Sequence, residues 1–262
     1  MKLIDNKANK DVKDYLSKGY IVKTIKQIKS LDYIRKIFIK EILKIFPSLK
    51  NQKPEYILNY IHKIVKVNGL NDFRLKIFNN VNKNEKFRIN YYNLSKEFLD
   101  QIVGNELVMQ SRVNLSIQMP KDSSSLLPIH ADTWSGVSPF EVVVWLPLVN
   151  CYRTKTMYIL KKDKISKVNK IILNKKLTTD QIFRKIKNDV IWLELKYGEV
   201  LIFDQSIPHG NVVNEEIETR WSMNCRFKGI FTPYGDKKLG EFFEPISLKP
   251  ASLRGINYKH PF

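Results

Sequence analysis

The sequence predicts a mainly β protein with helices, in which the strands form a sandwich or a double-sheet barrel. Two observations predict this class. Apolar side chains follow helical spacing through most of residues 1–105, whereas residues 106–250 contain short alternating or apolar runs between turn signals. With 262 residues, 43% of them hydrophobic, the chain is long enough to bury one large core. No composition shift marks a boundary, so we expect a single domain over residues 1–262.

The N-terminal part is expected to be mostly helical after a short strand at `GYIVKTI`. The run `DYIRKIFIKEILKIF` has helical spacing and is ended by Pro47. The next run, `PEYILNYIHKIVKVNG`, predicts a second helix that Gly69 closes. Two more helical stretches are expected near 70–81 and 94–104.

Four runs in the second part predict strands: `SRVNLSIQMP`, `FEVVVWLPLV`, `GEVLIF` and `TRWSMNCRFKG`. The first and last alternate between polar and apolar residues, and the other two are mainly apolar. A Lys-rich insert, residues 161–190, separates the second strand from the third. Within it, `TTDQIFRKI` predicts a helix capped by Thr178 or Thr179.

The net charge of +19 comes from 45 basic and 26 acidic residues. Lys is spread through every region and Arg is scarce, which favours a compositional bias over a nucleic-acid-binding face. Attraction of an anionic small substrate is also compatible with this charge. We expect a cytoplasmic protein without a membrane span, because no apolar run is long enough and Cys151 and Cys225 give no disulfide framework.

A candidate metal site begins in `LPIHADTWSG`, where His130 and Asp132 are two residues apart. In an extended segment, such positions project to the same side. His209 follows 77 residues after Asp132, beside Gly210 at the end of the predicted strand `GEVLIF`. Two histidines and one carboxylate form the facial triad of non-haem Fe(II) oxygenases, which leaves coordination positions open.

The strand after His209 provides a candidate anion site. Alternation puts Arg220 and Ser222 on one face together with Asn224 and Arg226. If this face lines a barrel interior, burial of Arg220 is costly unless an anion binds there, and a dicarboxylate cosubstrate would be such an anion. The alternative is a surface strand whose polar face meets water.

The pieces `HAD`, `PHG` and `RWS`, in this order and spacing, resemble the Fe(II)/2-oxoglutarate-dependent dioxygenases. `YLSKGYIVKTI` resembles the entry segment of the phytanoyl-CoA hydroxylase branch. The runs `TKTMYIL`, `GEVLIFDQSIPHGN` and `TRWSMNCRFKGIFTPYGDKKLGEFFEPI` look like oxygenases of bacterial carbohydrate-biosynthesis clusters, similar to a streptomycin-biosynthesis oxygenase. This narrower resemblance covers roughly residues 105 to 250.

The resemblance implies a double-stranded β-helix, or jelly-roll, core with the N-terminal helices packed on one sheet. It implies Fe(II) bound by His130, Asp132 and His209, with 2-oxoglutarate and O2 as cosubstrates and succinate and CO2 as products. Because Asp132 is present, it favours hydroxylation, desaturation or epimerisation over halogenation. The implied substrate is a sugar, nucleotide sugar or related small metabolite.

Other site residues are weaker candidates. We list Thr156 or Tyr158 for the cosubstrate, and for the substrate Arg112, Asn114, Gln118, Trp134 and Arg226. Trp134 either packs on a sugar ring or closes the barrel mouth, and Arg226 contacts either a substrate anion or an acidic neighbour. His62 and His260 are not expected to be ligands.

Three alternatives stay open from the sequence. One is an oxygenase that modifies nucleic acid, another is a non-catalytic carbohydrate-binding jelly roll, and the third is a cupin with a different metal. The sequence does not define the position oxidised, the oligomeric state or whether the insert 161–190 covers the site.

Overall fold

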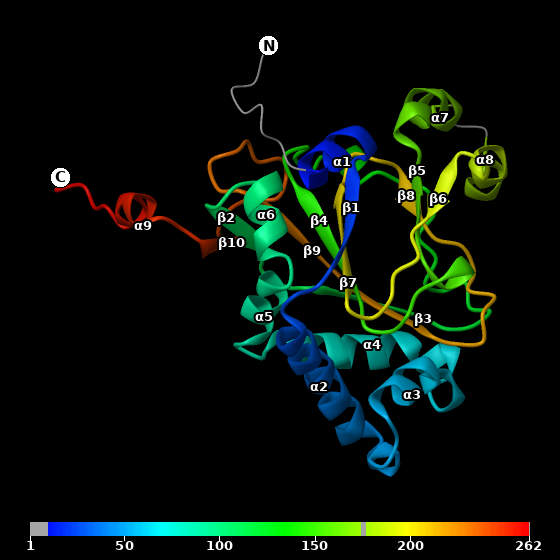
Figure 1. The fold of residues 1–262 in the computed structure, drawn as a ribbon. Coiled ribbons are helices and arrows are strands. Elements are labelled where there is room, and N and C mark those ends of the chain that lie inside the picture. The colour runs from blue at the N-terminus through cyan, green and yellow to red at the C-terminus, as the bar shows by residue number, and fades with distance from the viewer. Residues whose placement is uncertain (1–9, 174–176, 262) are drawn as a thin grey trace.

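A computed structural model describes residues 10–173 and 177–261, and within these ranges the strands form two antiparallel sheets (Figure 1). The larger sheet has seven strands, ordered β1 (Tyr20–Thr24), β7 (Glu199–Asp204), β4 (Val142–Pro147), β9 (Arg220–Gly229), β2 (Leu107–Gln110) and β10 (Phe243–Ser247), with β3 (Asn114–Gln118) also paired to β9. The smaller sheet has the order β6 (Val190–Trp192), β5 (Tyr158–Leu160) and β8 (His209–Gly210). The mainly β fold with helices is thus confirmed.

Strand β9 organises the larger sheet because it is long enough to pair with three neighbours. One edge pairs with β4 from Ser222 to Phe227, while the other pairs first with β3 and then with β2. Its apolar face is buried, and Trp221 and Cys225 are fully inaccessible to solvent. The alternation predicted for this strand is therefore observed, with the polar residues on the opposite face.

The helices before β2 cover the apolar face of the larger sheet (Figure 1). Two hydrogen bonds tie helix to sheet: the Trp221 indole donates to the Leu58 carbonyl at 2.9 Å, and the Tyr91 hydroxyl donates to the Val144 carbonyl at 2.8 Å. The helical elements are α1 (Lys10–Lys18), α2 (Ile28–Ile45), η1 (Pro47–Leu49), α3 (Pro54–Asn59), η2 (Ile61–Lys63), α4 (Val67–Asn82), α5 (Phe87–Asn93) and α6 (Lys96–Ile102).

The predicted helix ending at Gly69 is wrong, because the chain turns within it. Helix α3 stops at Asn59, and Gly69 lies in the first turn of α4. The carbonyl of Leu58 accepts from Trp221 and that of Asn59 accepts from the Thr219 amide at 2.7 Å. A continuous helix needs these carbonyls for its own hydrogen bonds, so contacts with β9 and with the residue before it end α3.

The Lys-rich insert contains α7 (Ile165–Ile172) and α8 (Thr179–Ile186), with residues 174–176 outside the described ranges. Of the two cap candidates, Thr178 caps α8, and it forms a capping box with Gln181 that was not predicted from the sequence. Phe183 on α8 packs against Tyr158 and Trp192 of the smaller sheet. This contact fixes α8 to the smaller sheet.

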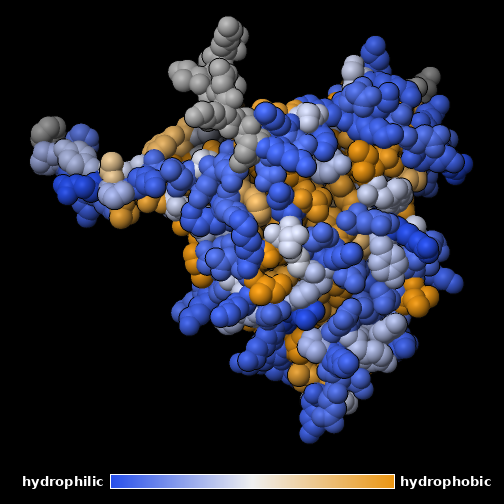
Figure 2. Space-filling view, viewed as in Figure 1, coloured by the Kyte–Doolittle hydropathy of each residue, from blue (hydrophilic) through white to orange (hydrophobic). Residues whose placement is uncertain are grey.

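Several short elements were not foreseen: α1, α5, β2, β5, β6, β8, β10, the helix α9 (Pro250–Ile256), and the 3-10 turns η3 (Asp132–Ser135), η4 (Arg153–Lys155) and η5 (Lys162–Lys164). They are short segments, so strand pairing and packing against the rest of the fold determine them. Hydrophilic residues are spread over the face shown in Figure 2, with apolar patches between them. Within the described ranges, no helix has both the length and the apolar character needed to cross a bilayer.

Candidate active site

Three side chains that the sequence singled out converge at the end of the smaller sheet. His130 forms an isolated antiparallel bridge with His209, the first residue of β8, and their backbone amides and carbonyls pair at 2.8 and 2.9 Å. Asp132 follows at the start of η3, where its amide donates to the Gln205 carbonyl. One ligand atom from each of His130, Asp132 and His209 lies within 4.8 Å of the others.

Both histidines are oriented in the same way. Nδ1 of His130 lies 2.8 Å from the Pro128 carbonyl, and Nδ1 of His209 lies 2.9 Å from the Ile207 carbonyl. A carbonyl only accepts, so each Nδ1 carries the proton and each Nε2 keeps a lone pair for a metal. Burial lowers the pKa of His209 to about 4, with a smaller contribution from His130. The His209 ring is therefore neutral at pH 7. The donor set therefore fits a divalent metal with N and O preference.

Arg226 pairs with one of the two carboxylate oxygens of Asp132. Arg226 Nη2 lies 2.8 Å from Asp132 Oδ2, whereas Asp132 Oδ1 is directed toward His130 Nε2, 3.7 Å away. Arg226 Nε donates to Gln205 Oε1 at 3.2 Å and lies 4.0 Å from Glu141 Oε2. Gln205 in turn donates to Glu141. Arg226 thus contacts acidic neighbours and leaves one Asp132 oxygen for a metal.

Arg220 lies at the other end of the same face of β9 and has a different environment. Its Nη1 donates to the Thr156 carbonyl at 3.4 Å and its Nη2 to Ser116 Oγ at 3.1 Å, but its buried Nε has no partner. Burial lowers the pKa of Arg220 to about 10, so the group stays charged at pH 7. Within the described ranges no carboxylate pairs with it.

Other polar atoms near Arg220 are also unsatisfied. Ser222 Oγ and Gln118 Oε1 are buried and form no hydrogen bond. The Nε–H of Arg220 and the Ser222 hydroxyl are buried donors without acceptors, which is costly, and an anion that accepts from both would remove the cost. These two donors are chemically suited to an anion, whereas the Gln118 oxygen is an acceptor and would need a donor.

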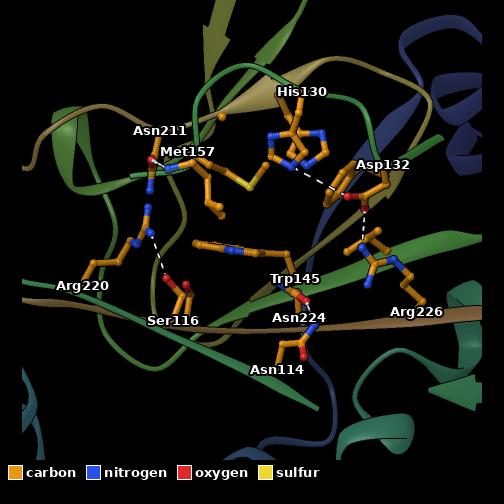
Figure 3. Close-up of a pocket in the computed structure, with 16 residues that line it drawn as sticks. Asn114, Ser116, His130, Asp132, Trp145, Met157, Asn211, Arg220, Asn224 and Arg226 are labelled. Carbon is orange, nitrogen blue, oxygen red and sulfur yellow. Dashed lines mark hydrogen bonds and ion pairs between the residues drawn. The ribbon is translucent and has the colours of Figure 1, made fainter. Parts of the chain in front are cut away.

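The two ends face one cavity of about 250 Å3 (Figure 3). In this view Arg220 and the His130–Asp132 pair lie on opposite sides, with Met157 and Trp145 drawn between them. The cavity is lined by Asn114, Ser116, Leu127, His130, Asp132, Val143, Trp145, Met157, Phe203, His209, Gly210, Asn211, Arg220, Ser222, Asn224 and Arg226. A metal and a bound anion can therefore share one enclosed space.

Seven of the site candidates proposed from the sequence line this cavity: His130, Asp132, His209, Arg220, Ser222, Asn114 and Arg226. Thr156 does not, because its hydroxyl donates to the Leu193 carbonyl at 2.5 Å, while its own carbonyl supports Arg220. The neighbouring Met157 lines the cavity in its place, since alternate residues of an extended segment face opposite sides. Tyr158 is buried in the smaller sheet.

Three substrate candidates lie away from the cavity lining. Arg112 precedes β3, stacks over the Phe78 ring at 4.4 Å and donates to Asn79. Gln118 is fully buried and donates to the Val212 carbonyl at 2.6 Å. Trp134 lies on η3 and is 47% exposed. Arg112 thus packs on α4 and not in the cavity. Trp134 is directed to solvent by the turn η3 that begins at Asp132.

The remaining lining residues were missed as site residues. Ser116 and Asn224 lie on the polar faces of β3 and β9 that alternation identifies, but the sequence provides no further reason to propose them as site residues. Trp145 and Phe203 come from apolar strands that read as ordinary core. No local signal distinguishes them, because the cavity exists only after the sheets pack.

Comparisons with known proteins support the fold. No model of a protein family and no curated protein matches this chain. Among solved structures, EctD from S. alaskensis in its apo form has a TM-score of 0.55 and 11% identity, covering 92% of this chain and 86% of that one. HygX from Streptomyces hygroscopicus, solved with nickel and 2-oxoglutarate, has a TM-score of 0.53 and 9% identity, covering 88% and 90%.

A third structure, the nickel complex of the non-heme monooxygenase ThoJ, has a TM-score of 0.53 and 11% identity, covering 91% of this chain and 84% of that one. At these identities the likeness establishes the shared fold. The chain therefore has the jelly-roll-like architecture found in non-heme, 2-oxoglutarate-binding proteins, and its own residues must supply the case for function.

Proposed function

We propose that the protein is an Fe(II)- and 2-oxoglutarate-dependent dioxygenase that hydroxylates a small metabolite. One observation carries this proposal: an open His130–Asp132–His209 ligand set and the uncompensated, buried Arg220 face the same cavity. The first provides the ligands of a facial triad and the second an anchor for a dicarboxylate. The similar structures, one of which holds nickel and 2-oxoglutarate, agree with this combination.

Each group of the chain has a defined task in this proposal. His130, Asp132 and His209 would hold the iron, and Arg220 with the Ser222 hydroxyl would hold the distal carboxylate of 2-oxoglutarate. Iron with 2-oxoglutarate and O2 supplies an oxidant for unactivated C–H bonds, with succinate and CO2 as products. Trp145, Met157 and Phe203 exclude water from the cavity, and the positioning residue Arg226 fixes Asp132. Because Asp132 occupies a ligand position, the site favours hydroxylation over halogenation.

The substrate proposed is a sugar, a nucleotide sugar or a related metabolite of carbohydrate biosynthesis, acted on in the cytoplasm by a single-domain enzyme. Asn114, Ser116 and Asn224 support this class, because they give the cavity wall amide and hydroxyl groups that can bond hydroxyl-rich ligands. The mixed polar and apolar lining also suits desaturation or epimerisation of such a molecule. The assay therefore follows succinate, which forms in all three reactions.

The test is anaerobic loading with Fe(II) and 2-oxoglutarate, followed by optical spectroscopy. A metal-to-ligand charge-transfer band is expected for the wild type and not for His130→Ala. Arg220→Gln should weaken 2-oxoglutarate binding about ten- to hundredfold, because a charge-assisted hydrogen bond contributes about 1.5–3 kcal/mol. Arg112→Gln is the matched control, since this arginine lies outside the cavity lining. Absence of the band and of succinate in the wild type would overturn the proposal.

A further inference from the structure

A second cavity of about 450 Å3 lies directly beside the candidate metal cavity. It runs between helix α4 and the segment Ser124–Leu127, along β3, and we call it the outer groove. Four residues line both spaces: Asn114, Ser116, Leu127 and Asn224. The two spaces therefore adjoin along these four residues, and a ligand that occupied both would pass over them.

The volumes show how a substrate would divide between these spaces. Sites that enclose a drug-sized ligand have about 300–1,000 Å3. The metal cavity has only about 250 Å3, and on the proposed function it must also hold a metal and a dicarboxylate. A substrate larger than a few atoms must then place its remaining part in the outer groove.

The wall of the outer groove formed by Ser124–Leu127 is held in place before any ligand binds. Ser125 Oγ donates to the Ile117 carbonyl of β3 at 2.8 Å, and the Leu127 amide donates to Asn211 Oδ1 at 2.7 Å. Asn211 Nδ2 also donates to the Ser125 carbonyl at 3.3 Å. A preformed wall lowers the entropy lost on binding, as expected for a true binding site.

At the junction of the two spaces, a chain of amides presents a hydrogen-bond donor. Gln110 Nε2 donates to Asn114 Oδ1 at 3.2 Å, and Asn114 Nδ2 donates to Asn224 Oδ1 at 2.9 Å. This order uses the oxygen of Asn224 and leaves its NH2 group for a ligand. A hydroxyl, ether or carboxylate oxygen of a substrate is the matching acceptor.

At the outer end, Arg74 is the only ionisable side chain among the described residues that line the groove. Its Nη2 donates to Asn71 Oδ1 at 2.7 Å, and no acidic residue of the described ranges pairs with it. Its guanidinium thus retains donors that can bind an oxyanion in a bidentate manner.

We propose that the outer groove binds the part of the substrate distant from the oxidised carbon, and that Arg74 binds a phosphoryl or carboxylate group there. The substrate class is then an elongated, hydroxyl-bearing anion whose reactive end reaches past Asn224 toward the metal. This inference rests on the proposed function for the position of the reacting carbon, but the anion site is tested by itself.

The first test is NMR of the arginine Nε–H groups in the protein loaded with Zn(II) and 2-oxoglutarate. Inorganic phosphate and acetate are titrated separately at constant ionic strength, and the anion that binds more tightly identifies the oxyanion preferred. The Arg74 signal of the wild type should shift saturably. Phosphate affinity measured by calorimetry should fall about tenfold in Arg74→Gln, because a hydrogen bond to a charged group is lost. Lys76→Gln is the matched control: it removes the same charge from an exposed position of the same helix.

Equal weakening in Arg74→Gln and Lys76→Gln, or no shift at Arg74, would overturn the anion site and indicate general attraction to a chain of charge +19. Failure of the proposed function can be distinguished from failure of the anion site, because the wild type would then not bind 2-oxoglutarate. The phosphate titration does not depend on turnover.

The second test locates the anion relative to the metal. With Mn(II) in place of Zn(II), 31P relaxation of phosphate should be enhanced less than for phosphate bound directly to the metal, and the enhancement should fall in Arg74→Gln but not in Lys76→Gln. Strong enhancement that is unchanged by Arg74→Gln means that phosphate binds the metal itself, and this outcome would contradict the outer-groove assignment.

Discussion

Arg220 and Arg226 lie six residues apart on the same face of β9 and line the same cavity, yet their surroundings are opposite. Arg226 meets Asp132, Glu141 and Gln205, so its charge is balanced inside the protein. Arg220 is more deeply buried and has only a carbonyl and a hydroxyl as partners. Arg226 therefore stabilises the folded site, whereas Arg220 keeps a charge without a counterion, which on the proposed function binds a ligand.

The largest effect is expected for Asp132→Ala, which removes a proposed metal ligand and the ion partner of Arg226. Affinity for Co(II) or Ni(II) should fall more than about a hundredfold. Loss of a residue that only hydrogen-bonds a metal ligand typically lowers metal affinity about ten- to hundredfold. Isothermal titration calorimetry measures it, with His62→Gln as a control outside the cavity. Unchanged affinity would remove Asp132 from the ligand set.

The next prediction contrasts Arg226→Met with Arg220→Met in the metal-free protein. Arg226→Met should lower the free energy of unfolding by about 2–4 kcal/mol, because it strands the carboxylates of Asp132 and Glu141. Arg220→Met should leave stability unchanged or raise it, since it removes a buried charge without an ion partner. Urea unfolding measures both, and equal destabilisation by the two changes would refute the comparison.

A smaller effect is expected for Glu141→Gln. Loss of this carboxylate leaves Asp132 as the only carboxylate paired with Arg226, and this makes Asp132 a weaker donor to a metal. Co(II) affinity should fall about tenfold, the lower end of the range for residues behind a ligand. Ser138→Ala nearby keeps the charges and serves as the control. An affinity equal to that of the wild type would show that Arg226 does not transmit the charge of Glu141.

The smallest effect concerns pH. Burial raises the pKa of Glu141 above its usual 4.5, although Gln205 and Arg226 oppose this. A folded-state pKa that is raised stabilises the protein at low pH, and this stability is lost as pH rises through the raised value. Relative to Glu141→Gln, the metal-free wild type should therefore lose stability above pH 4.5, by less than about 1.4 kcal/mol per pH unit. A parallel pH profile for both proteins would contradict a raised pKa.

The site shows where sequence reasoning succeeds and fails. Alternation in β9 predicts the shared face of Arg220 and Arg226, because the geometry of a strand is local. The same rule, applied to `SRVNLSIQMP`, placed Arg112 with Asn114, but β3 begins only at Asn114 and Arg112 turns to α4. Helix α3 likewise stops at Asn59, because Trp221 and Thr219 of a distant segment bond its last carbonyls.

The sequence by itself determined the mainly β class, the helical first part, and the residue types of the proposed triad and anion anchor. These features depend on residue spacing and side-chain chemistry within single segments. Tertiary structure decided that the charge of Arg226 has carboxylate partners and that of Arg220 has none. Asp132, Glu141 and Gln205 reach Arg226 only when β4, η3 and the end of β7 pack around β9. Tertiary structure also decided that Arg74 of α4 lines a groove beside the candidate metal cavity, a relation between distant segments that no periodicity encodes.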